Sequence, residues 1–180
     1  MPTLKPLRQY NESDVINMFS FDGAAAAKGA LVKPATASGW RSSDEPLAMD
    51  GVAGAAFTNS VSERYATSAK VALAGSGDAP IGMLLMQVVE TDENGEKLLF
   101  NPRKAAEMGV VVKGQTVPIL TKGIVLYNGA TLIAENPPAN TKVYAAANGE
   151  LTTLSTGKVL VGKTLGSKDS SSYILLKIEL

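Results

Sequence analysis

The chain of 180 residues contains no cysteine and no histidine. Without cysteine it can form no disulfide, no thiolate nucleophile and no cysteine metal site. Without histidine it lacks the commonest general base and metal ligand, which excludes Ser-His-Asp and Cys-His arrangements and most zinc sites. Carboxylate pairs, Ser–Lys pairs and all-oxygen cation sites remain possible, but no motif brings such residues together. We therefore expect a protein that is not an enzyme and that has no cofactor and no bound metal.

The chain also lacks an excess of charge and a long apolar run. Lys plus Arg and Asp plus Glu each number 17, and a nucleic-acid-binding protein usually carries a basic excess. The longest nearly apolar run, Ile81 to Val89, is interrupted by Gln87 and is too short to span a bilayer. The N-terminus has no apolar stretch of signal-peptide length. We expect no direct nucleic-acid partner and no membrane partner.

Turn-forming dipeptides are present instead. Asn-Gly suits the type I′ hairpin turn, because both central residues of that turn need a positive φ. The chain has three such pairs between strand-like runs. Asn94-Gly95 separates IGMLLMQVVETDE from EKLLF, Asn128-Gly129 separates KGIVLY from ATLIAE, and Asn148-Gly149 separates KVYAAA from ELTTL. They predict consecutive antiparallel hairpins and a mainly β fold, with one or more small β-barrel or β-tulip-like units.

The C-terminal residues Tyr173 to Leu180 alternate between apolar and polar side chains, which is the pattern of a half-buried strand. The sequence also predicts strands over these ranges: Asp14 to Phe19, Ala30 to Lys33, Lys70 to Ala74, Gly109 to Lys113, Thr116 to Leu120 and Lys158 to Gly162.

One short helix is predicted near residues 102–108. Asn101 can cap it, Pro102 suits its first position, and Gly109 can end it in the left-handed conformation. Two other segments of the sequence predict turns rather than ligand-binding sites. Gly75 to Gly82 departs from nucleotide-binding glycine motifs and predicts a turn between two strands. The acidic cluster of Asp92, Glu93 and Glu96 is typical of a polar hairpin tip rather than a cation site.

The expected organisation has three parts, which could also form one compact domain. Residues 1–20 form an N-terminal arm and first strand, residues 21–115 a first β unit with a long loop over 35–68, and residues 116–180 a second β unit. The loop contains Trp40, Phe57 and Tyr65. These rings either pin the loop to its own domain or anchor a partner, because aromatic residues are enriched in interface cores.

The N-terminal arm is the second candidate contact region. A Pro-containing, partly apolar and basic segment could lie along another subunit, or it could be a frayed terminus or an edge strand of its own sheet. The candidate contacts to a partner or to another subunit are therefore Leu4, Leu7, Arg8, Tyr10, Trp40, Phe57 and Tyr65.

The order of these features resembles the capsid decoration (cement) proteins of tailed double-stranded DNA bacteriophages. The resemblance is one of pattern and order and covers most of the chain except residues 35–68. Its segments are TLKPLRQYNESDVINMFSFDG with KGALVKP, APIGMLL, ENGEKLLFNPRKAAEMGVVVKGQTVPILTKGIVLYNG, NTKVYAAANGELTT with VLVGKTLGS, and YILLKIEL.

The resemblance implies small β-barrel or β-tulip-like domains on the outer surface of the capsid, made in the host bacterial cytoplasm. Such proteins stabilise the virion by bridging neighbouring major capsid proteins, often as dimers or trimers, and have no catalytic residues. Two other roles stay open. One is another phage head or tail module, such as a head fibre base or a tail tube, and the other is a carbohydrate-binding β domain.

Overall fold

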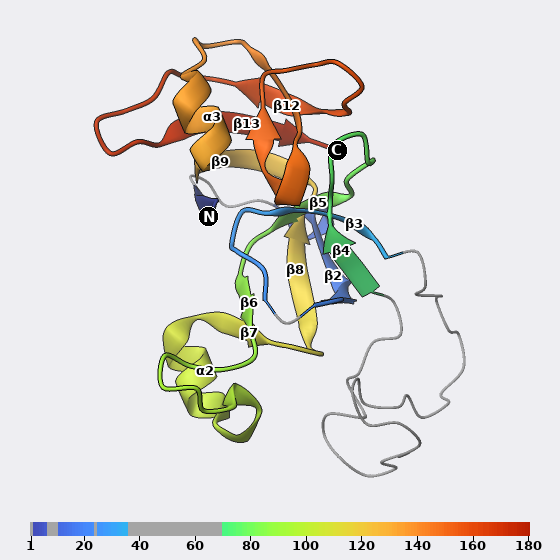
Figure 1. Ribbon diagram of the computed structural model, residues 1–180, viewed down its shortest axis with the longest axis vertical. Coiled ribbons are helices and arrows are strands. Elements are labelled where there is room, and N and C mark those ends of the chain that lie inside the picture. The colour runs from blue at the N-terminus through green and yellow to red at the C-terminus, as the bar shows by residue number, and fades with distance from the viewer. Residues whose placement is uncertain (1, 7–10, 24, 36–69) are drawn as a thin grey trace.

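The computed structural model describes residues 2–6, 11–23, 25–35 and 70–180. In this part of the chain strands predominate, and they form a closed barrel, a six-stranded sheet and a two-stranded sheet. Figure 1 shows the six-stranded sheet at one end of the long axis and the barrel in the middle. The two-stranded sheet and its helix lie at the other end. The predicted mainly β fold class is confirmed.

The barrel is closed by strands in the order β2-β4-β3-β5-β8. The bounds are β2 Val15–Phe21, β3 Leu31–Pro34, β4 Lys70–Leu73, β5 Gly82–Leu84 and β8 Thr116–Leu120. A 3-10 turn, η1 (Glu12–Asp14), precedes β2. The β2–β4 pair is parallel and the other pairs are antiparallel. Buried side chains such as Val32, Val71 and Ile119 form the barrel's core cluster.

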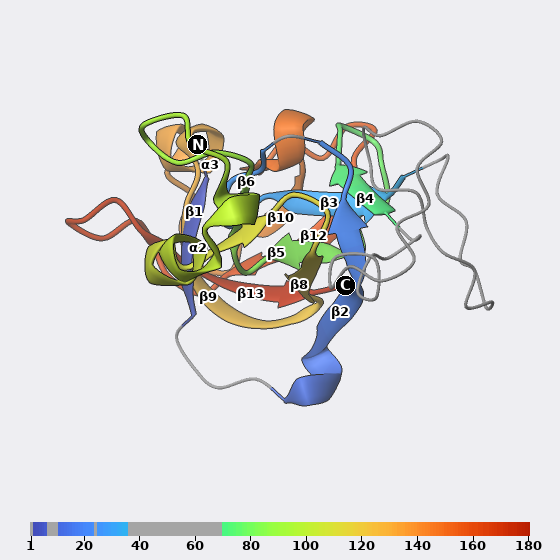
Figure 2. The same cartoon turned by 90° about the horizontal axis from the view of Figure 1, so that it is seen from below.

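The six-stranded sheet is antiparallel throughout, in the order β1-β9-β13-β12-β10-β11. Its bounds are β1 Thr3–Pro6, β9 Lys122–Asn128, β10 Lys142–Ala145, β11 Leu151–Thr152, β12 Leu160–Thr164 and β13 Ile174–Glu179. The helix α3 (Ala130–Glu135) packs on the inner face through Leu132. Figure 2 shows the paired strands β9 and β13 running side by side.

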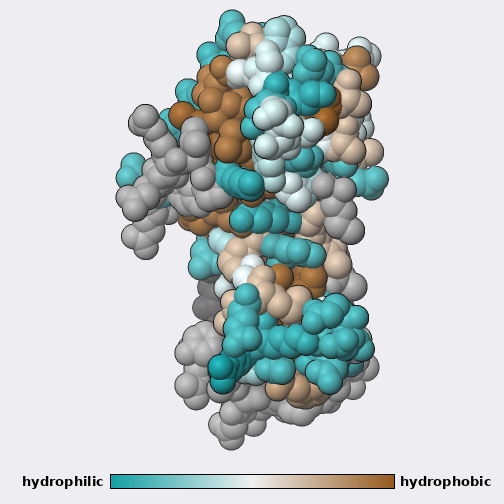
Figure 3. All heavy atoms as spheres, turned by 90° about the vertical axis from the view of Figure 1, so that its left-hand side faces the viewer, coloured by the Kyte–Doolittle hydropathy of each residue, from teal (hydrophilic) through white to brown (hydrophobic). Residues whose placement is uncertain are grey.

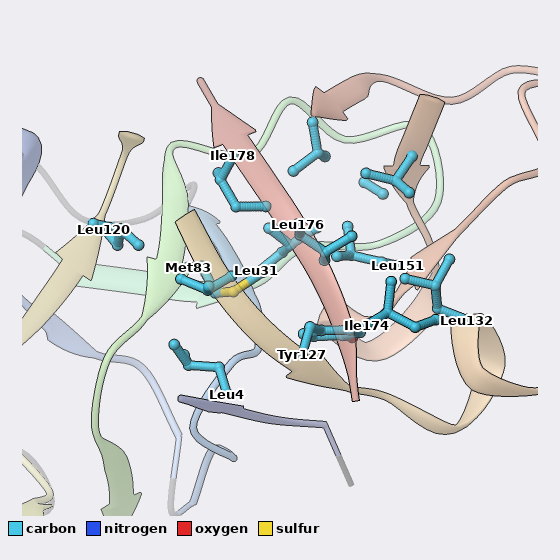
Figure 4. Packing of buried hydrophobic residues seen from close by; sticks show 14 of the residues in the cluster. Leu4, Leu31, Met83, Leu120, Tyr127, Leu132, Leu151, Ile174, Leu176 and Ile178 are labelled. Carbon is cyan, nitrogen blue, oxygen red and sulfur yellow. The ribbon is translucent and has the colours of Figure 1, made fainter. Parts of the chain in front are cut away.

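One hydrophobic core joins the barrel to the six-stranded sheet. Leu31, Met83 and Leu120 come from the barrel, and they lie in the same buried cluster as Tyr127 and Leu176 of the sheet (Figure 4). All five are fully buried. Because large apolar side chains from both sheets pack against one another in this cluster, their burial stabilises the two sheets together rather than separately.

The tip of the β10–β11 hairpin reinforces this joint. Its turn, η3 (Ala147–Gly149), has positive φ at Asn148 (58°) and Gly149 (72°), as the Asn-Gly dipeptide predicts. The Gly149 backbone N–H donates to the Ala74 carbonyl at 2.8 Å. A Cβ at this glycine would lie 2.7 Å from the carbonyl oxygen of Leu31. Glycine is therefore needed here for conformation and for the close approach to the barrel.

The remaining strands form a small lobe, called here the α2 lobe (residues 87–113). It contains β6 (Gln87–Val89) paired in parallel with β7 (Val110–Val112), the 3-10 turn η2 (Leu98–Phe100) and the helix α2 (Pro102–Met108). Leu98, Ala105 and Val112 form its own buried cluster.

The predicted helix is confirmed together with both of its caps. The Asn101 side chain accepts a hydrogen bond from the Lys104 backbone N–H, and Pro102 occupies the first helical position. Gly109 adopts the left-handed conformation (φ 64°) at the C-terminus. Local capping chemistry thus fixed both ends of α2. The seven strands that were predicted by their residue ranges are also confirmed, with their ends shifted by two residues or fewer.

The three Asn-Gly pairs have different outcomes. Asn148-Gly149 forms the predicted hairpin turn between β10 and β11. Asn94-Gly95 lies in a turn closed by a single antiparallel bridge between Thr91 and Lys97, after which the predicted strand EKLLF is instead the turn η2. At Asn128-Gly129 the hairpin prediction is wrong, because β9 is followed by the helix α3.

Tertiary contacts explain α3. The Thr131 backbone N–H and hydroxyl both donate to Glu150, and Leu132 is buried in the core. Gly129 is not in a positive-φ conformation (φ −112°). A Cβ there would lie 2.3 Å from the Tyr127 hydroxyl, so this glycine makes room for a ring rather than forming a turn.

The predicted division of the chain needs correction at two places. Strand β1, in the predicted arm, pairs with β9 of the six-stranded sheet. Strand β8, assigned to the predicted second unit, pairs with β2 and β5 in the barrel. The chain therefore crosses between the two sheets more often than the linear division assumed, and the sheets share one core. The predicted loop over 35–68 lies outside the described residues, except for Ala35.

Candidate interaction surfaces

Large apolar side chains that stay exposed are the first guide to a binding surface. In the described residues they are Met18, Leu99, Phe100, Met108, Leu154, Leu160, Leu165 and Leu180. Three of them belong to the α2 lobe, and Leu160 and Leu165 lie at the start and just beyond the end of β12. Two candidate surfaces follow, one on the α2 lobe and one on the six-stranded sheet.

On the α2 lobe the most exposed apolar side chain is that of Phe100, at 81%. The turn η2 accounts for its position. Leu98, two residues earlier, is 1% exposed and packs against Ala105 and Val112. The next element begins at once, because Asn101 caps α2. Phe100 is thus held between two fixed elements and presented to solvent, which is the arrangement of an interface anchor.

An ion pair also holds the α2 lobe together. The Asp92 carboxylate, which is fully enclosed, accepts from the backbone N–H groups of Asn94 (2.9 Å) and Glu96 (2.8 Å) and from the Lys104 ammonium. The hydrogen bond from Lys104 is the main cause of the lowered pKa of Asp92. The same bond is the main cause of the raised pKa of Lys104.

The direction of these pKa shifts determines the pH range in which the ion pair stabilises the lobe. A lowered pKa for Asp92 stabilises the lobe above its unfolded pKa of about 3.9, and this contribution is lost as the pH falls through the folded value. In the acidic cluster of Asp92, Glu93 and Glu96, the carboxylate of Asp92 therefore already accepts hydrogen bonds from the protein itself. Within the described residues no group of three metal-ligating side chains is found.

The second candidate surface is the outward face of the six-stranded sheet. Along β13, Ile174, Leu176 and Ile178 are fully buried, and the alternate residues Leu175 and Lys177 point to the other side. The cross-strand neighbour of Leu175 is Leu126 in β9, and the Leu165 backbone N–H donates to the Leu175 carbonyl at 2.7 Å.

Leu126, Leu175 and Leu165, half-buried or partly exposed, therefore form an adjacent row, called here the apolar strip. Figure 3 shows a hydrophobic area in the upper half of the molecule, where Figure 1 places this sheet, and a mainly hydrophilic surface lower down.

A row of lysines runs beside the apolar strip. Lys177 in β13 is paired with Lys163 in β12, and Lys163 is paired with Lys142 in β10. Directly opposed residues of antiparallel strands share a face, so these three lysines are neighbours on one face of the sheet. We call them the lysine row.

Glu179 is the carboxylate on this face of the sheet. It pairs with Lys177 at 3.0 Å and with Lys122 at 3.7 Å. These partners, Lys177 first, lower the pKa of Glu179. The sequence reasoning missed both the lysine row and Phe100, and selected neither as a candidate.

The predicted contact residues lie elsewhere. Leu4 is 2% exposed and packs in the shared core from β1, so it is corrected from a surface contact to a core residue of an edge strand. This agrees with the edge-strand alternative for the N-terminal arm. The other six candidates lie outside the described residues: Leu7, Arg8, Tyr10, Trp40, Phe57 and Tyr65.

The glycine-rich segment Gly75 to Gly82 joins β4 to β5, as the turn interpretation predicts. The Gly75 backbone N–H donates to the Asp78 carboxylate at 2.6 Å, and the same carboxylate lies 2.8 Å from the Lys33 ammonium. The Lys33 hydrogen bond is the main cause that lowers the pKa of Asp78. These contacts close the turn on itself.

Among the residues described, none of the helices is both long and apolar enough to cross a membrane. Comparison with protein-family models, curated proteins and solved structures finds no match to this chain.

Proposed function

We propose that this chain is a structural virion protein that binds the outer surface of a tailed-phage capsid and stabilises it by bridging major capsid proteins. The β scaffold supports this role, because buried side chains of the barrel and of the six-stranded sheet pack in one shared cluster. The ordered sequence resemblance to decoration proteins supports it independently.

The observation that carries the proposal is Phe100. Its ring is 81% exposed, which lowers solubility and adds nothing to the core. The lobe that carries the ring is held in place by the caps of α2 and by the ion pair between Asp92 and Lys104. The α2 lobe lies at the opposite end of the molecule from the six-stranded sheet (Figure 1). A bridging protein needs two separate contact regions, and the lobe provides one of them.

The test uses empty capsid shells of the phage that encodes the chain, prepared without this protein. Purified protein is added at increasing concentration and the shells are pelleted. We expect saturable co-sedimentation at a copy number fixed by the lattice. Phe100→Ser should weaken the apparent affinity by about tenfold or more. Its melting temperature should stay near that of the unchanged protein, because exposed positions contribute little to stability.

Leu154→Ser is the matched control, because Leu154 is 64% exposed and lies outside the α2 lobe. It should bind shells like the unchanged protein. Failure of the unchanged protein to reach saturable, lattice-defined binding would contradict the proposal. Binding at the few copies expected of a vertex fibre or a tail would instead favour the alternative head or tail module.

A further inference from the structure

The lysine row is unfavourable for the fold that contains it. Like charges directly opposite each other in antiparallel strands destabilise the pair, and Lys163 faces a lysine on both sides. A threonine or glutamate at position 163 would relieve both repulsions without touching the core, because the side chain is exposed. Stability alone therefore does not account for the row.

Protection of a sheet edge does not account for it either. Lysines are common on edge strands, where they prevent pairing with other chains. The free edges of this sheet are β1 and β11, whereas Lys163 and Lys177 lie on the interior strands β12 and β13.

The carboxylates of the same sheet do not neutralise the face. Glu135 accepts from Thr152 and Thr153, and Asp169 accepts from the backbone of its own loop. Glu150 is held by Thr131 of α3. Glu179 alone reaches the lysines, and in the described part of the chain no ion pair involves Lys142 or Lys163.

Two further lysines extend the basic character of the face. Lys122 lies opposite Glu179, and Lys5 in β1 lies opposite Leu126, with its ammonium 4.4 Å from the centre of the Tyr173 ring. The face thus combines five lysines, one glutamate and the apolar strip, on a chain whose formal net charge is zero. An apolar centre with charged groups around it is the usual anatomy of a protein–protein interface.

Protein carboxylates fit this face better than nucleic-acid phosphates do. Phosphate sites favour the guanidinium fork of arginine, and the described arginine, Arg103, lies on α2 in the opposite lobe. A phosphate backbone would also leave the apolar strip unused, because contacts to phosphates are mainly electrostatic.

We propose that the outward face of the six-stranded sheet docks on a carboxylate-rich protein surface, with the lysine row facing the carboxylates and the apolar strip packed beside it. The identity of that partner, the major capsid protein, rests on the proposed function. The chemistry of the contact rests on the register of the sheet. With Phe100 at the other end, this face provides the second contact that bridging requires.

Lys163→Glu is the decisive variant, because it should move stability and binding in opposite directions. A glutamate between Lys142 and Lys177 replaces two repulsions by two attractions, so the melting temperature should rise by about 1–4 °C. Affinity for capsid shells at about 0.15 M salt should fall about tenfold, since a carboxylate would then face carboxylates. The loss should shrink at high salt, because the Debye length shortens and the repulsion between the carboxylates is screened.

Lys28→Glu is the control, with the same change of charge at a half-buried lysine that precedes β3 and lies outside both the six-stranded sheet and the α2 lobe. It should bind shells like the unchanged protein. If Lys163→Glu also binds like the unchanged protein, the inference is overturned while the proposed function stands. A stability gain without a loss of binding would identify the row as an ordinary solvated surface.

If the unchanged protein does not bind shells at all, the proposed function fails, and immobilised poly-L-glutamate decides the inference separately. Retention at low salt that Lys163→Glu abolishes and Lys28→Glu preserves would support the carboxylate-binding face. Equal elution of all three proteins would overturn it. Stronger retention of the unchanged protein on double-stranded DNA than on poly-L-glutamate would also overturn it.

Discussion

The two faces of strand β13 differ in burial and in charge. On the inner face, Ile174, Leu176 and Ile178 are fully buried against the barrel's side chains (Figure 4). On the outer face, Leu175 stays partly exposed and Lys177 lies against a second lysine. The inner residues are those that the stability of the fold selects. The outer residues include an arrangement that weakens the sheet, which is why we assign binding to that face.

The largest effect is expected on the inner face. Leu176→Ala should lower the free energy of unfolding by about 2–5 kcal/mol, because it leaves a cavity where the two sheets meet. Chemical denaturation measures this value. Leu175→Ala, one residue away on the outer face, is the matched control and should cost clearly less. Equal losses for the two variants would contradict the separation of the faces.

A smaller effect of opposite sign is expected at Tyr127, also on the inner face. In the described residues its hydroxyl is the buried side-chain atom that lacks a hydrogen-bond partner. Burial, and then the charge of Glu150, raises its pKa; the Leu151 backbone N–H acts weakly the other way, without the geometry of a hydrogen bond.

Tyr127→Phe should therefore raise the free energy of unfolding by about 1 kcal/mol, because it removes an unsatisfied buried polar group and keeps the ring. Denaturation by urea at neutral pH provides the measurement. A loss of stability would show that the hydroxyl has a favourable contact after all.

The smallest effect is expected on the outer face, at Glu179. Its pKa is lowered by Lys177 and Lys122, so its contribution is present above its unfolded pKa of about 4.3 and disappears as the pH falls through the folded value. Glu179→Gln should be slightly less stable than the unchanged protein at neutral pH and equal to it near pH 2. It should also bind shells somewhat more tightly, because a carboxylate leaves the basic face. Weaker binding would count against carboxylates as the partner.

Local signals in the sequence predicted much of the fold. The caps of α2 and the Asn148-Gly149 turn depend on residues next to each other in the chain, so they can be recognised without the tertiary structure. At Asn128-Gly129 the same dipeptide failed, because the burial of Leu132 and the contact between Thr131 and Glu150 favour a helix. Those contacts join residues far apart in the sequence.

The candidate surfaces were harder to predict for the same reason. Lys142, Lys163 and Lys177 become neighbours only through the register of three strands, and a shift of one residue would turn a lysine inward. Phe100 was assigned to a strand, where alternation would not single it out, whereas the turn η2 exposes it. Leu4 shows the reverse, since an apolar residue in a presumed arm completes the core from an edge strand.

The bridging role itself is tested most directly by imaging shells saturated with the purified protein. A reconstruction by electron cryo-microscopy should show the protein on the outer surface, with the α2 lobe against one capsid subunit and the outward face of the six-stranded sheet against its neighbour. Density confined to the inner surface or to a tail would contradict this account, as would a bound protein whose lysine row faces solvent.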